Sequence, residues 1–536
     1  MFCNTPQVNQ LTSLLVSHQV TDIVVCPGSR NATIVHNLNE LHDAIHIHPV
    51  TDERSAAFVA LGMTLATERT VAVCVTSGSA LLNCIPAVAE AYYRHLPLLV
   101  ISADRPQEWI DQLDGQTLPQ TQALMPYVPT YTLTTPHTDT QLWANNRAIN
   151  EAILRTKQYG GRPSHINVAI EEPMFHFSTP TLPEERVVRT YAIASASPIP
   201  QDVVRMISEA RLPALLIGQY ERGDIRAVTN SLIENSQLLV LPEIISDVQG
   251  NKLMNAFDAL SQTPDERIMP DIIVQIGGNF VHKAFKQALR KSSCQVVRIG
   301  YDDHLSDTFC HLAFYLQADT RMALEQLSSV LPKYKKSVIE ACKFLEKHPQ
   351  PLGIEDNSSL TINSTLNELH SQLSHLSSSF TLHLANSTAV RAAGQVFRSG
   401  SFPIFCNRGV NGIEGSLSTA VGYSMKMWGL NIVIIGDLSF FYDANALWNT
   451  HLPSNLRILL LNNGHGAIFD HLPGLSASPA RNEYIAAGGR GYSAQGICQS
   501  FGVGYAKVER ITDLSTSIAQ WLREDLPTAA LIEVMV

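Results

Sequence analysis

The strongest constraint on the fold is a series of short runs of Val, Ile and Leu, each ending in Gly, Asp, Asn or Pro. They occur along most of the chain, as DIVVCPG, VAVCVTSGS, LPLLVISAD, ALLIGQ, LLVLPE, DIIVQIGG, CQVVRIG, IVIIGD and ILLLNN. Strands that are apolar on both faces are typical of parallel sheets covered by helices, and helical stretches alternate with these runs. The pattern predicts an α/β protein whose ligands bind at the carboxyl ends of the strands.

Two stretches rich in Pro, Ser and Thr divide the chain, at residues 178–200 and 346–364. Such composition is typical of connectors. A chain of 536 residues is also long enough for two to four domains with sizeable cores. We therefore expect three domains, at residues 1–180, 195–335 and 355–536.

The first and third of these domains resemble each other. Each reads as a small-residue helix, an apolar strand, a Gly turn, a helix, a Pro and a second apolar strand. Gly78 and Gly436 stand at matching turns, and Pro97 and Pro453 precede the closing strands. Two similar domains around a different middle one predict a functional site built between the pair.

The composition indicates which kinds of partner the protein can bind and in which cellular compartment it lies. The net charge is 38 − 48 = −10, which disfavours a nucleic-acid partner because phosphate binding needs a basic face. No apolar run approaches the roughly 20 residues that span a bilayer, so we do not expect an integral membrane protein. Nine cysteines without a CxxC pair indicate reduced thiols. With a first basic residue only at Arg30, the sequence predicts a cytoplasmic protein without a signal peptide.

Two strand ends in the third domain carry ligands suited to a divalent cation. Asp437 follows the strand IVIIG, and Asn463 follows ILLLN 26 positions later. Mg²⁺ prefers a carboxylate, neutral oxygens and phosphate oxygens. The side chains of Asp437 and Asn463 and the backbone carbonyl of His465 would supply three ligands, and Gly464 and Gly466 would let the backbone curl around the ion.

The spacing from Gly-Asp to Asn-Asn resembles the cofactor-binding motif of the thiamin diphosphate enzyme superfamily. The resemblance implies two related, doubly wound parallel-sheet domains that bind thiamin diphosphate, on either side of an α/β middle domain. It also implies Mg²⁺ or Mn²⁺ as the metal. Many members carry Gly-Asp-Gly, whereas this chain has Gly436-Asp437-Leu438-Ser439, so the turn after the metal ligand can differ from the usual one.

More specific motifs point to one branch of that superfamily. They are CPGSRNATI (26–34), DERSAAFVALG (52–62), TSGSALLN (76–83), SADRPQEWID (102–111), ANSTAVR (385–391), NRGVNGIEG (407–415) and GDLSFFYDANAL (436–447). In this order they are similar to the 2-succinyl-5-enolpyruvyl-6-hydroxy-3-cyclohexene-1-carboxylate synthase family of menaquinone biosynthesis. The resemblance implies a transferase that decarboxylates 2-oxoglutarate and adds the resulting carbanion to isochorismate.

The same resemblance assigns the cofactor residues. Glu53 matches the catalytic glutamate that hydrogen-bonds the aminopyrimidine ring and favours its imino tautomer. Ile413 matches the residue that wedges between the two cofactor rings. The full set implied for the cofactor is Glu53, Ser77, Gly78, Asn83, Ile413, Gly436, Asp437, Leu438, Ser439, Asn463 and Ile468.

The substrate residues implied by the resemblance are mostly cationic, because both substrates are dicarboxylates and arginine pairs both oxygens of a carboxylate. Ser387, Arg391 and Arg408 would hold the part derived from 2-oxoglutarate. Phe469 and Leu472, with Ile468, would form an apolar wall. The set implied for isochorismate is Ser29, Arg30, Arg105, Gln116 and Lys283. Within this set, Lys286 is an open alternative to Lys283.

The oligomeric state, two alternative functions and the task of the middle domain stay open at this point. Members of the superfamily build each site from two subunits, which implies a homodimer or a homotetramer. Another thiamin enzyme, such as an acetolactate synthase or a simple 2-oxoacid decarboxylase, is an alternative that would need fewer cations. A non-catalytic α/β protein that senses a nucleotide or thiamin diphosphate is a further alternative, and the sequence assigns no task to the middle domain.

Overall fold

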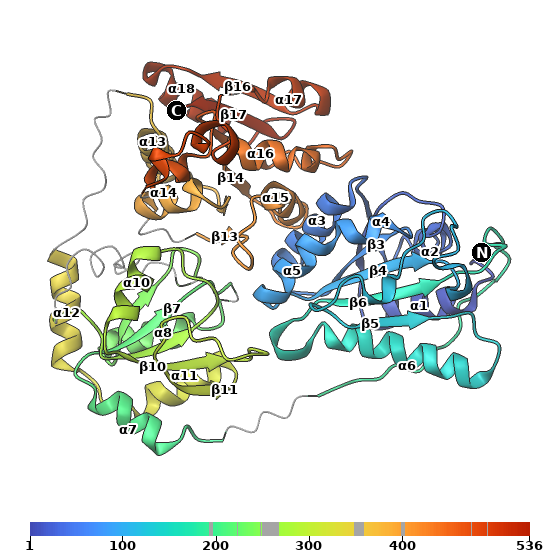
Figure 1. Cartoon of the computed structure of the whole chain (residues 1–536), viewed down its shortest axis with the longest axis horizontal. Coiled ribbons are helices and arrows are strands. Elements are labelled where there is room, and N and C mark those ends of the chain that lie inside the picture. The colour runs from blue at the N-terminus through green and yellow to red at the C-terminus, as the bar shows by residue number, and fades with distance from the viewer. Residues whose placement is uncertain are drawn as a thin grey trace.

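The computed structural model describes residues 1–191, 197–221, 223–246, 248, 267–347, 359–397, 402–472, 474–489 and 491–536. These residues form three sheets, and every strand pair recorded in them is parallel. Figure 1 shows the three units that result, with the N-terminal unit at the right, the middle unit at lower left and the C-terminal unit above it. The α/β fold predicted from the apolar runs is confirmed. Two of the expected domain limits, at residues 195 and 355, lie outside the described residues.

The N-terminal unit contains a six-stranded sheet of order β2-β1-β3-β4-β6-β5. Its elements are α1 (Pro6–Ser17), β1 (Asp22–Val25), α2 (Ala32–Asn39), β2 (His46–Pro49), α3 (Glu53–Thr67), β3 (Val71–Val75), α4 (Ser79–Asn83), α5 (Ile85–Arg94), β4 (Leu98–Asp104), β5 (Thr130–Leu133), α6 (Asp139–Arg155) and β6 (Ser164–Ala169).

The middle unit contains a five-stranded sheet of order β11-β10-β9-β7-β8. Its elements are α7 (Gln201–Glu209), β7 (Pro213–Ile217), α8 (Arg226–Glu234), β8 (Leu239–Pro242), β9 (Ile272–Ile276), α10 (Lys283–Lys291), β10 (Gln295–Gly300), β11 (Leu312–Gln317), α11 (Thr320–Val330) and α12 (Lys336–Lys347). Helix α12 buries Val338, Ala341 and Leu345 in the core cluster on one face of this sheet.

The C-terminal unit contains a six-stranded sheet of order β13-β12-β14-β15-β17-β16. Its elements are α13 (Ile362–Leu373), β12 (Phe380–Leu384), α14 (Thr388–Val396), β13 (Ile404–Cys406), α15 (Ser416–Ser424), β14 (Leu430–Gly436), α16 (Asp437–Tyr442), β15 (Leu456–Asn462), α17 (Gln495–Phe501), β16 (Gly504–Val508), α18 (Ile511–Trp521) and β17 (Ala530–Met535). When its strands are counted from its own first strand, the order is that of the N-terminal sheet. The similarity predicted from the sequence between the outer domains is therefore confirmed as a shared topology.

Central strands such as β3 and β7 are apolar along their length because both of their faces are covered. In β1, Ile23 and Val25 pack into the core cluster on one face, and Val24 packs into the cluster on the other. Successive side chains of a strand point to opposite faces, so a strand buried on both sides is apolar at most positions.

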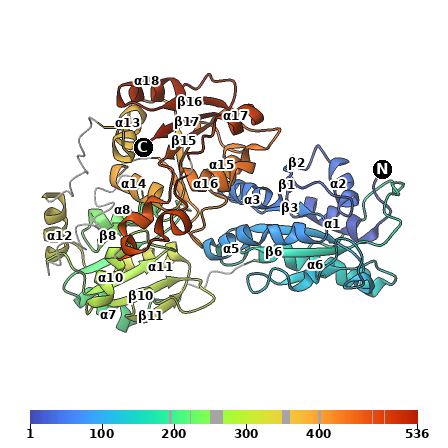
Figure 2. The ribbon, with the colours of Figure 1, turned by 45° about the horizontal axis from the view of Figure 1, so that its top comes forward.

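Helices α3 and α15 join the two outer units at a close crossing. A Cβ atom on Gly62 would lie 1.9 Å from the backbone oxygen of Thr419, and one on Gly422 would lie 1.9 Å from that of Val59. Glycine is required at both places because the two backbones meet there. The core cluster around this crossing runs without interruption from the N-terminal sheet into the C-terminal one, and Figure 2 shows α3 beside α15 and α16.

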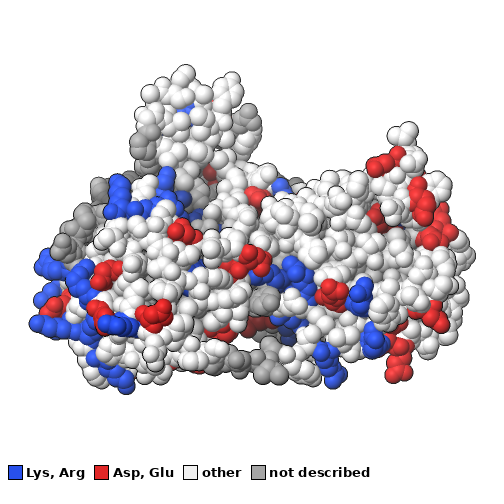
Figure 3. Space-filling model, turned by 60° about the horizontal axis from the view of Figure 1, so that its bottom comes forward, with Lys and Arg blue, Asp and Glu red and all other residues white. Residues whose placement is uncertain are grey.

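The face seen in Figure 3 carries interspersed basic and acidic side chains over the middle unit at its left, whereas acidic side chains gather at the far end of the N-terminal unit at its right.

Among the helices that the structure describes, none combines the length and the apolar composition needed to cross a membrane.

Candidate active site

The expected metal ligands come together where two neighbouring strands end. Strand β14 pairs with β15, and Gly436 lies opposite Leu461, so the residues that follow the two strands are adjacent. Asp437 is buried, and this burial raises the pKa of its carboxyl above the usual range. Hydrogen bonds from the backbone N–H groups of Leu438 and Gly464 lower the same pKa in part. A buried carboxylate in contact with the glycine loop is a suitable first ligand for a hard cation.

The glycine loop is fixed by two buried polar residues that the sequence analysis did not select. The Asn462 amide donates to Glu533 Oε1 at 2.7 Å and to the Tyr492 carbonyl at 2.8 Å. Its oxygen accepts from the Gly464 N–H at 3.2 Å. Glu533 is fully buried in β17. The signal that could have revealed it is an ionisable residue in the apolar strand ALIEVM, because buried charges need partners.

The His465 ring is held by two neighbours, and its Nδ1 lies 3.0 Å from the Asn463 carbonyl oxygen. The imidazole Nε2 pairs with Asp470 Oδ2 at 2.7 Å, and this hydrogen bond raises the pKa of His465. Its backbone carbonyl accepts one hydrogen bond, from Ala467 N at 3.0 Å. A carbonyl oxygen has a second lone pair, so it can still bind a cation.

The backbone at this edge is open beside two glycines. Apart from the adjoining residues, no heavy atom of the described residues lies within 4 Å of a Cβ placed on Gly436 or on Gly464. The Ser439 hydroxyl donates to the carbonyl of Ile413 at 2.5 Å, which ties the start of α16 to the loop that precedes α15. The open glycines, the buried Asp437 and the neutral oxygens of Asn463 and His465 therefore fit the metal and diphosphate of thiamin diphosphate.

The expected pyrimidine residues gather at the carboxyl edge of the N-terminal sheet. Glu53 is the first residue of α3, and its Oε2 accepts from Asn83 Nδ2 at 3.1 Å. Ser77 is buried, and its hydroxyl has no hydrogen-bond partner in the described structure. Gly78 has a φ of +84° and donates its N–H to Gln120 Oε1 at 2.7 Å. Gln120 was not selected from the sequence, and no motif there singles it out.

Two arginines expected to bind isochorismate share acidic partners at this edge. Arg30 is buried and pairs with Glu172 Oε1 at 3.1 Å. Arg105 pairs with Asp114 Oδ2 at 2.7 Å and lies 3.9 Å from the same Glu172 oxygen. Of the other residues expected here, Ser29 is exposed and Gln116 has a φ of +58° beside Gly78.

A second group of cations lies near the C-terminal edge. Partial desolvation and the nearby Arg408 guanidinium lower the pKa of Arg391, and Arg391 NH1 donates to the Ser387 carbonyl at 2.6 Å. Burial, and then Arg408, lower the pKa of Lys286 as well. In the described part of the chain, none of these three cations forms an ion pair with a carboxylate.

The open choice between two lysines has a structural basis. Lys283 is exposed at the first position of α10, whereas Lys286, one turn later, is half-buried. Lys286 Nζ donates to the Phe280 carbonyl at 3.0 Å. Of the two lysines, Lys286 is therefore the one held beside Arg408.

The expected apolar wall follows the glycine loop in a short helical turn, Ala467–His471. Ile468 and Phe469 are half-buried, and Leu472 is 39% exposed. A Cβ on Gly466 would lie 2.9 Å from the Phe469 ring, so the ring packs against the loop.

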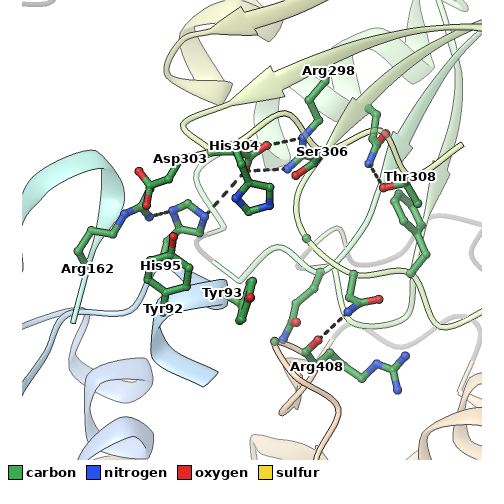
Figure 4. Close-up of a pocket in the computed structure, with 17 residues that line it drawn as sticks. Tyr92, Tyr93, His95, Arg162, Arg298, Asp303, His304, Ser306, Thr308 and Arg408 are labelled. Carbon is green, nitrogen blue, oxygen red and sulfur yellow. Dashed lines mark hydrogen bonds and ion pairs between the residues drawn. The ribbon is translucent and has the colours of Figure 1, made fainter. Parts of the chain in front are cut away.

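A pocket of about 210 Å³ lies where the three units meet. In Figure 4, Arg408 lies across this pocket from the contact between His95 and Arg162. Arg298 pairs there with Asp302 at 2.9 Å, and Arg162 donates to the Tyr301 carbonyl at 2.7 Å. The sequence analysis did not predict this pocket, because its lining residues come from segments far apart in the chain.

Comparisons with known proteins identify the family and the fold of the chain. Residues 8–124 match the family described as thiamine pyrophosphate enzyme, N-terminal TPP binding domain. The chain also superimposes on the crystal structure of benzoylformate decarboxylase from Polynucleobacter necessarius with a TM-score of 0.74 and 17% identity, covering 100% of this chain and 99% of that one. This likeness shows the fold.

Two curated relatives are much closer in sequence, and both are named 2-succinyl-5-enolpyruvyl-6-hydroxy-3-cyclohexene-1-carboxylate synthase. The protein from Bacteroides fragilis is 38% identical over 545 residues, covering 99% of this chain and 96% of that protein. The one from Phocaeicola vulgatus is 40% identical over 522 residues, covering 95% and 91%.

The fold, the N-terminal match and the named relatives show that the chain is a thiamin diphosphate-dependent α/β enzyme. With relatives of this identity over nearly its whole length, the chain belongs to the 2-succinyl-5-enolpyruvyl-6-hydroxy-3-cyclohexene-1-carboxylate synthase family.

Proposed function

We propose that the chain decarboxylates 2-oxoglutarate and joins the remaining four-carbon unit to isochorismate. The products are carbon dioxide and 2-succinyl-5-enolpyruvyl-6-hydroxy-3-cyclohexene-1-carboxylate, an intermediate of menaquinone biosynthesis. The observation that carries the proposal is the group of cations at Arg391, Arg408 and Lys286, which lack carboxylate partners among the described residues, in a chain whose relatives bear this synthase name. Two dicarboxylate substrates require such cations.

The cofactor would be held by both outer units. Asp437, Asn463 and the His465 carbonyl would bind Mg²⁺ or Mn²⁺, because these are the hard oxygen ligands that both ions accept. Gly436, Leu438 and Ser439 would contact the diphosphate, and Ile413 and Ile468 the rings. Ser77, Gly78 and Asn83 would line the pyrimidine site.

Glu53 would hold a proton between its carboxyl and the pyrimidine nitrogen, and Asn83, 3.1 Å from Oε2, orients that carboxyl. When bound, thiamin diphosphate supplies the electron sink that takes up the electron pair released with carbon dioxide.

The substrates would bind between the two groups of cations. Ser387, Arg391 and Arg408 would hold 2-oxoglutarate, with Lys286 beside them. Ser29, Arg30, Arg105 and Gln116, with Lys283 as the further cation, would hold isochorismate. Phe469 and Leu472 would exclude water from the reacting carbons, which strengthens the electrostatic contacts inside the site.

We also propose that the chain acts as a homodimer or homotetramer in the cytoplasm. Large apolar side chains are exposed around the start of α3, including Leu82 at 41%, Tyr442 at 51% and Trp448 at 49%. The Arg54 guanidinium lies 4.7 Å from the centre of the Tyr442 ring. Exposed apolar groups beside Glu53 favour a subunit interface that completes the site. All nine cysteines are free thiols, as expected of a reducing compartment.

Incubation with 2-oxoglutarate and isochorismate, compared with pyruvate alone, tests the reaction. We expect carbon dioxide and the adduct only from the first mixture. Rapid use of pyruvate without an adduct from isochorismate would favour another thiamin enzyme. Calorimetric binding of thiamin diphosphate and Mg²⁺ without any turnover would favour a sensor.

A further inference from the structure

The loop that carries Arg408 is anchored by all three units. The side chain of Glu90, on α5 of the N-terminal unit, accepts from the N–H groups of Gly409 and Val410, each at 2.9 Å. Asn279 of the middle unit donates to the Arg408 carbonyl at 2.9 Å. Asn386 of the C-terminal unit accepts from Arg408 NH1 at 3.1 Å. The backbone on both sides of the Arg408 side chain is therefore fixed.

Burial raises the pKa of the Glu90 carboxyl, and the Arg94 guanidinium and the Gly409 and Val410 N–H groups lower it in part. Glu90 is 1% exposed, and Arg94 NH1 lies 3.5 Å from its Oε1. Arg94 also donates to Asn407 Oδ1 at 2.7 Å and pairs with Glu221 of the middle unit at 2.6 Å. One arginine and two N–H groups thus offset part of the cost of burying this carboxyl group.

The loop is pressed against α5 so closely that it has little freedom. A Cβ atom on Gly409 would lie 2.9 Å from the Glu90 backbone oxygen and 2.9 Å from its Oε2. Any side chain at position 409 would therefore push the loop away from Glu90.

The guanidinium of Arg408 depends on this anchoring. Its NH1 has one partner, Asn386, and its buried Nε has no hydrogen-bond partner within the described structure. No carboxylate in the described ranges holds it by an ion pair. Its position is therefore determined by its backbone, and Glu90 holds that backbone directly after Arg408.

We infer that Glu90 is a positioning residue for 2-oxoglutarate: by holding the Gly409 and Val410 amides it places the Arg408 guanidinium where the substrate carboxylate binds. The inference rests on the proposed function, which assigns Arg408 to this substrate. A displacement of about 1 Å at a positioning contact can cost on the order of 100-fold in rate, so the geometry of the loop matters as much as its charge.

Two substitutions separate positioning from general stabilisation. Glu90→Gln and Glu221→Gln each remove one carboxylate partner of Arg94, but only Glu90 touches the Arg408 loop. The full-length enzyme is assayed with thiamin diphosphate and Mg²⁺, varying each substrate in turn. In Glu90→Gln we expect KM for 2-oxoglutarate to rise about tenfold or more, corresponding to 1.4 kcal/mol per tenfold, with KM for isochorismate and cofactor affinity nearly unchanged. Glu221→Gln should change KM for 2-oxoglutarate far less.

Equal effects of the two variants, or an unchanged KM for 2-oxoglutarate in Glu90→Gln, would overturn the inference. Should Glu90→Gln fail to fold, Gly409→Ala moves the same loop while keeping every charge, and the same rise in KM for 2-oxoglutarate is expected. Failure of both variants to fold would also overturn the inference, because the network would then serve folding. A wild-type enzyme that does not use 2-oxoglutarate and isochorismate contradicts the proposed function itself.

Discussion

The N-terminal and C-terminal sheets share one strand order but differ in what their carboxyl edges carry. The N-terminal edge presents the Glu53 carboxyl and the unpartnered Ser77 hydroxyl, which suit a polar ring. The C-terminal edge presents Asp437 and two open glycines, which suit a metal and a diphosphate. In the proposed function, one architecture would hold the two ends of the cofactor by different chemistry, because strand order fixes where an edge lies and the residues after each strand decide what it binds.

The arginines assigned to the substrates also differ between the two edges, because only those at the N-terminal edge have acidic partners among the described residues. Arg30 and Arg105 already have acidic partners, Glu172 and Asp114. Arg391 and Arg408 have no carboxylate partner in the described residues. An uncompensated group of positive charges gains more from an incoming dianion than a compensated one, because no existing ion pair is lost. We therefore expect an arginine without an acidic partner to contribute more to substrate binding than an arginine that already has one.

The largest effects should come from replacing Glu53 or Asp437, the carboxyl residues at the two edges. Glu53→Gln should keep cofactor binding but lower kcat about 100-fold or more, because a positioned proton-transfer group is lost. Asp437→Asn should instead abolish Mg²⁺-dependent binding of thiamin diphosphate, because a charged ligand is lost. Turnover assays and calorimetry distinguish the two outcomes. Near-normal turnover in Glu53→Gln would refute the role of Glu53.

Replacing one arginine at either edge should give the next largest effects. Arg408→Gln should raise KM for 2-oxoglutarate roughly 100-fold, the loss expected when a charge-assisted contact to a carboxylate is removed. Arg105→Gln should raise KM for isochorismate, and by a smaller factor, because Asp114 already compensates that charge. Steady-state kinetics with each substrate varied provide the measurement. An equal rise in both KM values for either variant would contradict the division of the substrates between the edges.

The contact between the two units can be tested at the helix crossing. Gly422→Ala places a methyl group 1.9 Å from the Val59 carbonyl oxygen, and we expect a loss of about 3 kcal/mol in the free energy of unfolding. The matched control is Gly496→Ala in α17, where no heavy atom lies within 4 Å of the new Cβ. That change should be neutral or stabilise by about 0.4–1 kcal/mol. Urea unfolding measures both, and equal stability of the two variants would show that the crossing is not tight.

A smaller effect concerns the pH dependence of stability and arises at Asp443 in the C-terminal unit. Burial raises the pKa of Asp443 to about 6, and its two oxygens accept from the Ser418 N–H and hydroxyl, each at 2.7 Å. Because the folded state holds this proton more tightly than the unfolded state, stability falls as pH rises from the unfolded pKa, near 4, to about 6 and is constant above that.

The wild-type enzyme should therefore lose roughly 2–3 kcal/mol across this window through Asp443, and Asp443→Asn should remove that part of the slope. Thermal unfolding of both proteins between pH 4 and 7 makes the comparison. The same slope in both would show that other groups account for it.

Local patterns in the sequence predicted that the candidate metal ligands follow two neighbouring strands. The carboxylate Asp437 and the amide Asn463 follow apolar strands, and parallel neighbouring strands necessarily end at the same edge. Glu90, Gln120 and Glu533 could not be found this way, because each acts on a segment remote in sequence. The choice between Lys283 and Lys286 also needed the packing of α10, which leaves one exposed and the other beside Arg408.

The sequence by itself determined that the chain is a parallel α/β protein with a repeated outer unit and with a carboxylate and an amide side chain after two of its strands. These follow from short-range patterns of apolar residues and turn residues, which depend on local geometry alone. Tertiary structure alone decided which arginines are already neutralised, which glycines let α3 and α15 touch, and which buried carboxylate anchors the Arg408 loop. Those facts depend on contacts between units, and desolvation and charge pairing are properties of the folded arrangement.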